Sequence, residues 1–353
     1  MMPSRPMTVG DEPSDQPYAR WQVVDDPHGG RFIVLRVDGK DPAGHWVYRV
    51  VRDFSRPLEP SAYASTSTDA DRLKRYELNY VANRPHVRLS AGDVPRSDVV
   101  YLVGSGPSLR KNWMHLLDVT RGVVLGVNQT PGLIPTERMD YFMCIDYSLD
   151  GSHWRDRMHG TVGIFDVAAT PAVHLGSFKE KRWFVPASRS PFYDKARLAF
   201  PHLVMLEHGL NVTFTALSWI VRVLKARTIV LVGMDCSCPE SMRHFDEPLV
   251  FDAGEEYLVA KDVRGHAVIT NRIYLDMAEW HTGVFWFLKD AGIRVVNATE
   301  GGILTNFVEQ RCLHDVVPEL NGSASRSSGL TAEVAKSAKD GRDKRLEMSS
   351  RDR

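Results

Sequence analysis

One turn of the sequence has residues suited to binding a phosphate group. The turn is Gly104-Ser-Gly-Pro-Ser-Leu109, whose two glycines allow a sharp bend and a close approach of the backbone to a ligand. Pro107 suits the first turn of a helix, and Ser105 or Ser108 can cap the free amides there. Because backbone N–H groups at a helix start bind phosphate, the turn is either a phosphate site or an ordinary strand-to-helix connection.

Two common phosphate-binding motifs do not describe this turn. Leu109 stands near the place of the third glycine of the dinucleotide fingerprint, and no Gly-Lys-Ser/Thr follows as in a P-loop. Spacing alone therefore leaves both interpretations open.

A second turn, His208-Gly-Leu-Asn211, comes directly before an apolar helical stretch at Val212–Lys225. Asn211 or Thr213 can cap that helix, and Gly209 allows close approach by a ligand. The turn is therefore a capped helix start, and it could also be a second anion or nucleotide site.

Amide and acidic side chains follow other apolar runs. Asn128 and Gln129 can read a base or ribose edge, since each amide offers donors and acceptors, although an isolated Asn is commonly a helix cap. Asp146 can hold a ribose hydroxyl, a metal or a catalytic proton. For Asp235 a site role and a structural role are equally open.

Two later segments add further candidates. His244 lies in a loop rich in Pro and Asp, where it is either a solvated surface residue or an acid/base group with a pKa near neutrality. Farther along, Asn297, Thr299 and Glu300 stand just before the adjacent glycines that begin at Gly301, a pattern that indicates backbone wrapped closely around another group.

Most of these residues directly follow or adjoin short β-branched runs, and helical patterns at Val212–Lys225 and Arg272–Lys289 lie between the runs. Near-continuous apolar strands alternating with helices indicate an α/β fold with a doubly wound, mostly parallel sheet. In such sheets ligands bind beyond the carboxyl ends of the strands. The predicted strands are Val99–Val103, Val123–Val127, Tyr141–Ile145, Val162–Phe165, Leu203–Leu206, Thr228–Val232 and Ile293–Val296.

The chain ahead of this domain divides into two parts. Residues 1–17 are rich in Pro, Ser, Asp and Gly and are predicted to be disordered. Residues 18–97 form a small N-terminal α+β accessory region, with a hairpin of strands at Arg31–Val37 and His45–Arg52 and a polar helix at Asp69–Val81.

The nucleotide-type domain is predicted at residues 98–312, and residues 313–353 are predicted to be a mostly disordered polar tail. Residues 323–353 contain eight Lys or Arg and five Asp or Glu, a net charge of +3, whereas the whole chain has 44 of each kind. The rest of the chain is therefore slightly acidic. A phosphate ligand must be held by local groups rather than by bulk charge.

The composition of the 353 residues excludes several classes of protein. The balanced charge argues against a protein that coats nucleic acid or an anionic membrane. No apolar stretch is long enough to span a membrane, and Asp11 and Glu12 stand where a signal peptide needs an apolar run. The four cysteines form no disulfide framework, and Cys236 and Cys238 lack the second pair of a zinc site. We expect free thiols and a cytoplasmic protein.

Seven segments occur in the order Gly104–Leu109, Cys144–Asp146, His208–Ala216, Leu231–Asp235, His244–Phe245, Thr270–Asn271 and Val296–Gly302. Together they resemble the family that joins the flagellin motility accessory factors and the archaeal 6-hydroxymethyl-dihydropterin pyrophosphokinases. The resemblance covers about residues 98–305 and implies a Rossmann-like domain. Val127-Asn128-Gln129 is in addition similar to a segment of bacterial sialyltransferases.

The resemblance implies two activities. One is transfer of a nonulosonic, sialic-acid-like sugar from a CMP donor to Ser or Thr of a protein. The other is transfer of pyrophosphate from ATP to a pterin alcohol with magnesium. The sialyltransferase-like segment favours sugar transfer, so the leading hypothesis is a glycosyltransferase-like enzyme that uses a nucleotide-activated sugar. A pyrophosphokinase-like transferase is the alternative, and a non-catalytic nucleotide-binding module is a second alternative. The acceptor is left open as a glycan, a protein or a pterin.

For the leading hypothesis, backbone amides of the first turn hold the donor phosphate, His244 acts as the acid, and Asp146 or Asp235 acts as base or ribose ligand. No metal is required, because a CMP-sugar carries a single phosphate, and no cofactor is tightly bound. For the ATP alternative, Asp146 and Asp235 bind magnesium, with Glu300 as a third ligand. The residues expected at the nucleotide are Gly104, Ser105, Gly106, Pro107, Ser108, Asn128, Gln129, Gly209, Asn211, Thr213, Asn297, Thr299, Glu300 and Gly301.

Overall fold

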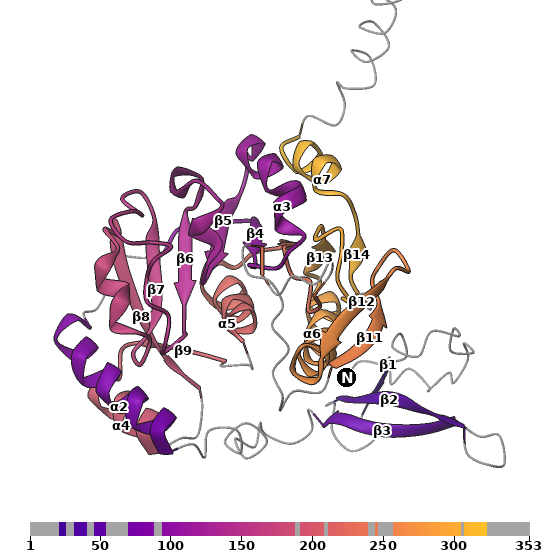
Figure 1. Ribbon diagram of the computed structural model, residues 1–353, viewed down its shortest axis with the longest axis horizontal. Helices are drawn as coiled ribbons and strands as arrows, with labels where there is room; N and C mark the ends of the chain where they lie inside the picture. Colours follow the sequence, from indigo (N-terminus) through magenta and orange to yellow (C-terminus); the bar gives the residue numbers. More distant parts are fainter. Residues whose placement is uncertain are drawn as a thin grey trace, which may run out of the picture.

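The structure is a computed structural model that describes residues 21–25, 32–40, 46–53, 70–87, 94–187, 191–207, 211–238, 244–245, 257–304 and 307–322. Its main body is a nine-stranded sheet in which all neighbouring strands run parallel, with helices packed on both faces (Figure 1). This arrangement confirms the predicted α/β, Rossmann-like, doubly wound fold.

The strand order of the main sheet is β14-β13-β10-β4-β5-β6-β7-β8-β9. The chain therefore moves outward from β4 to β9 and then returns with β10 to the other side of β4. All seven predicted strands are present, and β8 and β14 are additional. The strands are β4 (Val99–Val103), β5 (Val123–Val127), β6 (Tyr141–Cys144), β7 (Val162–Asp166), β8 (Glu180–Pro186), β9 (Val204–Leu206), β10 (Thr228–Val232), β13 (Arg294–Asn297) and β14 (Glu309–Gln310).

The central strand β4 is buried on both faces, which explains its unbroken apolar sequence. Tyr101 and Val103 point into one hydrophobic core, and Val100 and Leu102 point into the other. Successive side chains of a strand alternate between faces, so a strand with helices on both sides needs apolar residues at every position.

Two long helical segments cover the second of these faces. One is α5 (Val212–Trp219), which continues as the π-helical turn η7 (Ile220–Leu224), and the other is α6 (Arg272–Asp290). Both helices were predicted. The predicted single helix at Val212–Lys225 is thus α-helical only in its first two turns.

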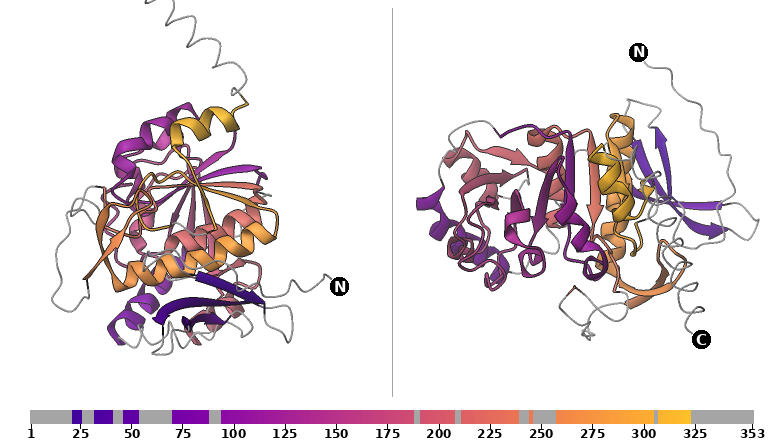
Figure 2. Two further views of the ribbon diagram at one scale, coloured as in Figure 1. Left: turned by 90° about the vertical axis from the view of Figure 1, so that its right-hand side faces the viewer. Right: turned by 90° about the horizontal axis from the view of Figure 1, so that it is seen from above.

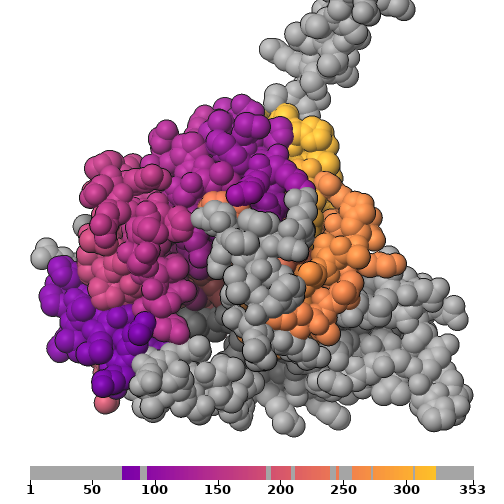
Figure 3. Space-filling model, in the orientation of Figure 1, coloured from indigo at the N-terminus to yellow at the C-terminus, as the bar shows by residue number. Residues whose placement is uncertain are grey.

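Other helices pack on the opposite face of the sheet. Together with the remaining short helical turns they are α2 (Ala70–Asn83), η2 (Arg84–His86), α3 (Leu109–Asn112), η3 (Trp113–Asp118), η4 (Thr130–Gly132), η5 (Thr136–Arg138), η6 (Pro171–Leu175), α4 (Pro191–Ala199) and α7 (Leu313–Leu320). In the space-filling view, α2 lies at one end of the body and the hairpin of β11 (Tyr257–Lys261) and β12 (Ala267–Asn271) at the other (Figure 3).

The accessory region contains the predicted antiparallel hairpin and one further strand. β2 (Phe32–Lys40) pairs with β3 (Trp46–Asp53) and with β1 (Trp21–Asp25). This small sheet lies beside α6, which contacts β1 and β3 (Figure 2). The prediction of disorder for residues 1–17 lies outside the described residues.

The core of the main domain extends past the boundary predicted at residue 312. Leu313, Val316 and Val317 of α7 are buried against the sheet. The Ser-, Ala-, Lys- and Arg-rich composition that predicts disorder begins only at Ser323, and residues 323–353 lie outside the described part of the chain.

Two other sequence expectations can be compared with the described residues. The four cysteines are free, as predicted. Within the described ranges, every helix is too short or too polar to cross a membrane.

Candidate functional site

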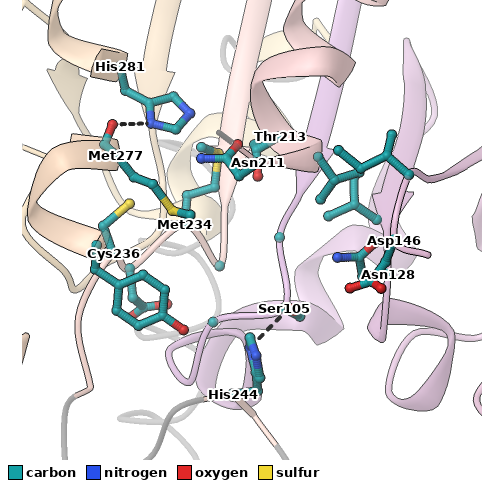
Figure 4. Close-up of a pocket in the computed structure, with 18 of the residues that line it drawn as sticks. Ser105, Asn128, Asp146, Asn211, Thr213, Met234, Cys236, His244, Met277 and His281 are labelled. Atoms are coloured by element: carbon teal, nitrogen blue, oxygen red, sulfur yellow. Dashed lines mark hydrogen bonds between the residues drawn. The ribbon is translucent and has the colours of Figure 1, made fainter. Parts of the chain in front are cut away.

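A cavity of about 360 Å³ opens where β4, β5, β6 and β10 end. The strand order reverses beside β4 at this place, because β5 and β10 lie on its two sides. Such switch points are where open α/β sheets bind ligands. Side chains from several segments converge on the cavity (Figure 4).

The glycines of the turn after β4 line the cavity, but their amides are already bonded within the protein. The amide of Gly104 donates to the carbonyl of Val232, and the amide of Gly106 donates to the carbonyl of Gly233, each at 2.8 Å. These two amides are therefore not available to bind a phosphate, which differs from the prediction. The glycines instead let the ends of β4 and β10 cross closely, since a Cβ on either residue would lie 2.6 Å from the Gly233 oxygen.

Asp235 is buried beside this turn and is held by Ser108. The Ser108 hydroxyl donates to Oδ2 of Asp235 at 2.8 Å, and the Ser108 amide donates to the same atom at 3.3 Å. Within the described part of the chain Oδ1 of Asp235 has no hydrogen-bond partner, and burial raises the pKa of the carboxyl to about 7. Asp235 lines the cavity, whereas Ser108 and Pro107 do not, so Ser108 positions the carboxyl rather than contacting a ligand.

The raised pKa of Asp235 has a consequence for stability. In the folded protein the carboxyl stays protonated up to about pH 7, whereas the unfolded chain ionises it near the ordinary value of 3.8. The protonated Asp235 carboxyl therefore contributes fully to the free energy of unfolding below about pH 4, and this contribution is lost as the pH rises toward 7. We expect the melting temperature of the Asp235→Asn variant, relative to the wild type, to rise between about pH 4 and pH 7 and to level off above that. A difference that is constant with pH would contradict the raised pKa.

His244 faces the same turn. Its Nδ1 lies 3.2 Å from the Ser105 hydroxyl, and the amide of Phe245 donates to the Ser105 carbonyl at 3.0 Å (Figure 4). A hydroxyl can donate to or accept from Nδ1, so this bond orients the ring in either protonation state. His244 and Ser105 both line the cavity, as predicted for a site residue on this loop.

Asn128 and Asp146 follow neighbouring strands and lie side by side in the cavity wall (Figure 4). Asn128 has a left-handed backbone with φ of 50°, which Asn tolerates better than most residues, and its side-chain oxygen is buried without a partner. Oδ1 of Asp146 accepts the amide and the hydroxyl of Ser148 at 2.7 Å. Gln129, also predicted at the nucleotide, does not line the cavity.

The start of α5 faces the cavity. The side chain of Asn211 accepts the amide of Phe214 at 2.8 Å, which confirms the predicted N-cap. Asn211 and Thr213 both line the cavity, so the positive end of the helix dipole is directed at it. Gly209 lies outside the described residues.

The segment after β13, which the sequence predicts at the nucleotide, lies behind the loop that carries Asp235 and outside the cavity lining. The Thr299 hydroxyl accepts the amide of Met234 at 3.1 Å, and Oε1 of Glu300 accepts the amide of Leu313 at 3.0 Å. The segment supports the loop that carries Asp235 and the first residue of α7, and the group it wraps is protein, not ligand. Four predicted binding residues therefore do not line the cavity: Asn297, Thr299, Glu300 and Gly301.

Helix α6 contributes cavity residues that the sequence did not single out. They are Tyr274, Met277 and His281, one or two turns apart on one face of the helix. The signal that could have found them is their spacing, since His281 falls four residues after Met277 and seven after Tyr274 and so shares their helix face.

The accessory helix α2 also reaches the cavity. Tyr76 lines it beside Tyr147, with the two ring centroids 5.0 Å apart. Two buried side chains tie α2 to the main domain: Asn79 donates to the carbonyl of Ala168 at 3.3 Å, and Asn83 donates to that of Ala169 at 2.8 Å. The N-terminal accessory region, to which the sequence analysis assigns no function, thus contributes a lining residue to the cavity through α2.

The charges at the cavity are few. Asp146 and Asp235 follow β6 and β10, which are separated by three strand spacings, roughly 14 Å. The described lining residues include no Lys or Arg. Among the described residues, the cluster with ligand atoms close enough to share a metal ion is Cys312, His314 and Asp315, and none of these lines the cavity.

No family model and no curated protein matches the sequence. Among solved structures, the chain is similar to one described as a MAf glycosyltransferase from Magnetospirillum magneticum AMB-1, at 16% identity and a TM-score of 0.49. The alignment covers 76% of this chain and 46% of the other, so this chain spans less than half the length of that protein. At this identity and TM-score the likeness assigns no activity to this chain.

Proposed function

We propose that the protein is a glycosyltransferase-like enzyme that binds a nucleotide-activated sugar in the switch-point cavity, with a CMP-linked sugar as the donor. The observation that carries the proposal is the charge of the cavity. Its described lining has no Lys or Arg, and the groups able to meet an anion are the α5 N-terminus and His244. Such a site suits one phosphate.

A nucleoside triphosphate needs more positive charge than this cavity offers. Enzymes that move phosphoryl groups use Lys or Arg and carboxylate-bound magnesium to neutralise the phosphates. Here Asp146 and Asp235 stand on opposite sides of the cavity, too far apart to hold one ion together without a large movement. The pyrophosphokinase alternative is therefore the weaker proposal.

The remaining groups fit the parts of a nucleotide. Asn128 and Asp146 offer hydrogen-bond acceptors for ribose hydroxyls or a base amine, and Tyr76 and Tyr147 give the same end an aromatic wall. Asn211 at the start of α5 is placed for the phosphate. His244 would protonate the leaving phosphate or activate the acceptor hydroxyl.

The segments that resemble the transferase family converge on this cavity. Five of the seven contribute lining residues, and the Val296–Gly302 segment supports the Asp235 loop from behind. Segments far apart in the chain thus meet at one site, which supports a shared ligand for them.

The test is a thermal-shift panel of CMP, UDP, GDP and ATP, each with and without magnesium. A ligand that binds only the folded state raises the melting temperature. We expect CMP to stabilise the protein without a metal. Stabilisation by ATP with magnesium alone would overturn the proposal. Binding of CMP without turnover of any sugar donor would support a non-catalytic nucleotide-binding module instead.

A further inference from the structure

The end of the cavity formed by α6 contains a buried histidine with an unused ring nitrogen. Nδ1 of His281 lies 2.7 Å from the carbonyl of Met277, and the side chain is 1% exposed. A carbonyl only accepts, so Nδ1 carries the proton and Nε2 is left as an acceptor. Nε2 has no partner among the residues that the structure describes, and Figure 4 shows it turned away from Met277 toward the side where Asn211 and Met234 lie.

A further unpartnered polar atom, in addition to those of Asn128 and Asp235, lines the same cavity from the loop after β10. The hydroxyl of Ser237 has no hydrogen-bond partner among the described residues, and the residue is 1% exposed. Buried polar groups are nearly always paired, because an unpaired one loses its hydration without compensation. Several such atoms at one cavity, from different elements, indicate that a ligand completes their hydrogen bonds.

Part of the lining of this cavity is adaptable and mostly apolar. Met234 and, from α6, Met277 and Tyr274 line the same cavity as His281 and Ser237. Methionine side chains adapt to irregular ligands, and the flat carbon face of a sugar ring packs well on such surfaces. The combination of an apolar wall with isolated neutral hydrogen-bonding groups matches a ring that carries hydroxyl or amide substituents.

We infer that the α6 end of the cavity is the subsite for the transferred sugar, where Nε2 of His281 accepts a hydrogen bond from a sugar hydroxyl or N–H and the Ser237 hydroxyl makes a second one. The inference rests on the proposed function and adds an orientation to it. The nucleoside lies toward Asn128 and Asp146, the phosphate lies at the start of α5, and the sugar lies against α6.

The protonation of His281 agrees with this assignment. Burial lowers its pKa to about 4, so the imidazole is neutral near pH 7. A neutral imidazole with Nδ1 already donating recognises a hydrogen-bond donor, and it does not recognise an anion. His281 is therefore a specificity residue for the sugar and not a second phosphate ligand.

The test compares the affinities of CMP and CMP-N-acetylneuraminic acid by calorimetric titration of the whole chain. His281→Asn keeps an amide donor near the Nδ1 position and removes the Nε2 acceptor, whereas His281→Gln places an amide oxygen near the Nε2 position. We expect His281→Asn to lower the affinity for the sugar-linked nucleotide by about tenfold, which corresponds to the loss of one hydrogen bond, and to leave the affinity for CMP unchanged. His281→Gln should restore part of the loss.

Several outcomes would overturn the inference. Equal weakening of both compounds by His281→Asn would place the residue at the nucleotide, and no weakening of either would remove it from the site. If the wild type binds CMP and binds the sugar-linked nucleotide no more tightly, the sugar subsite is contradicted and the proposed function is not. If the wild type binds neither compound, the proposed function is overturned as well. If His281→Asn does not fold, Ser237→Ala removes a single oxygen and should show the same selective loss.

Discussion

Replacing His244 with alanine is expected to lower the rate of the proposed sugar transfer by about 10²- to 10⁴-fold, while binding of the proposed nucleotide stays close to that of the wild type. The imidazole is oriented by Ser105 and lines the cavity next to the turn after β4, where a leaving phosphate would need a proton. The phosphate itself is proposed to bind at the start of α5, so binding does not depend on His244. The measurement is donor turnover together with calorimetric titration of CMP.

The matched control for this variant is His159→Ala, an exposed histidine that does not line the cavity. It should leave both turnover and binding unchanged. Wild-type turnover by His244→Ala would show that another group is the acid. A parallel loss of CMP binding would instead assign His244 to holding the nucleotide.

Replacing Gly106 with alanine is expected to destabilise the protein by about 1–3 kcal/mol, the usual effect of forcing a methyl group into a packed site. The added Cβ would meet the Gly233 oxygen at 2.6 Å and the carboxylate of Asp235 still more closely. The Gly233 oxygen belongs to the backbone, so a rotamer change cannot relieve this contact. Urea unfolding should show a lower midpoint with an unchanged slope.

Gly160→Ala is the control for that measurement. A Cβ at Gly160 meets no atom within 4 Å, and the residue is exposed. Its unfolding midpoint should match the wild type. Equal midpoints for Gly106→Ala and Gly160→Ala would mean that the β4 and β10 ends are not packed as closely as described.

The sheet was largely predictable because its central strands are apolar at every position. Val99–Val103 and Val123–Val127 stand out from polar surroundings and were predicted with the bounds that the structure shows. β8 was missed because its first residues, Glu180 to Arg182, are charged and only half-buried, which leaves a short apolar run. Its place between β7 and β9 comes from tertiary packing that local sequence does not encode.

The candidate site was predictable where a polar residue ends a strand. Asp146 and Asp235 followed from that rule alone, because the carboxyl ends of parallel strands meet at one edge. The rule was misleading for Asn297 and Glu300, since the polar groups after β13 are used to hold protein segments. His281 was missed because a helix buried on most sides shows the same apolar pattern whether it faces a core or a cavity.

The glycine-rich turn shows why residue type did not give the role. Glycines are required wherever backbone approaches another group, and at Gly104 and Gly106 that group is the end of β10. A glycine-rich turn that packs closely on protein has the same sequence pattern as one that binds a phosphate. The two kinds of turn are distinguished only by the hydrogen-bond partner of each amide.

The attachment of α2 bears on how ligand preference could diverge in related chains. Asn79 and Asn83 fix the helix to carbonyls beyond β7, and Tyr76 then closes one side of the cavity. This helix lies outside every segment that resembles the transferase family. A related chain could therefore keep the sheet, the turns and His244 while exchanging α2, and so admit a different ligand without rebuilding the rest of the cavity.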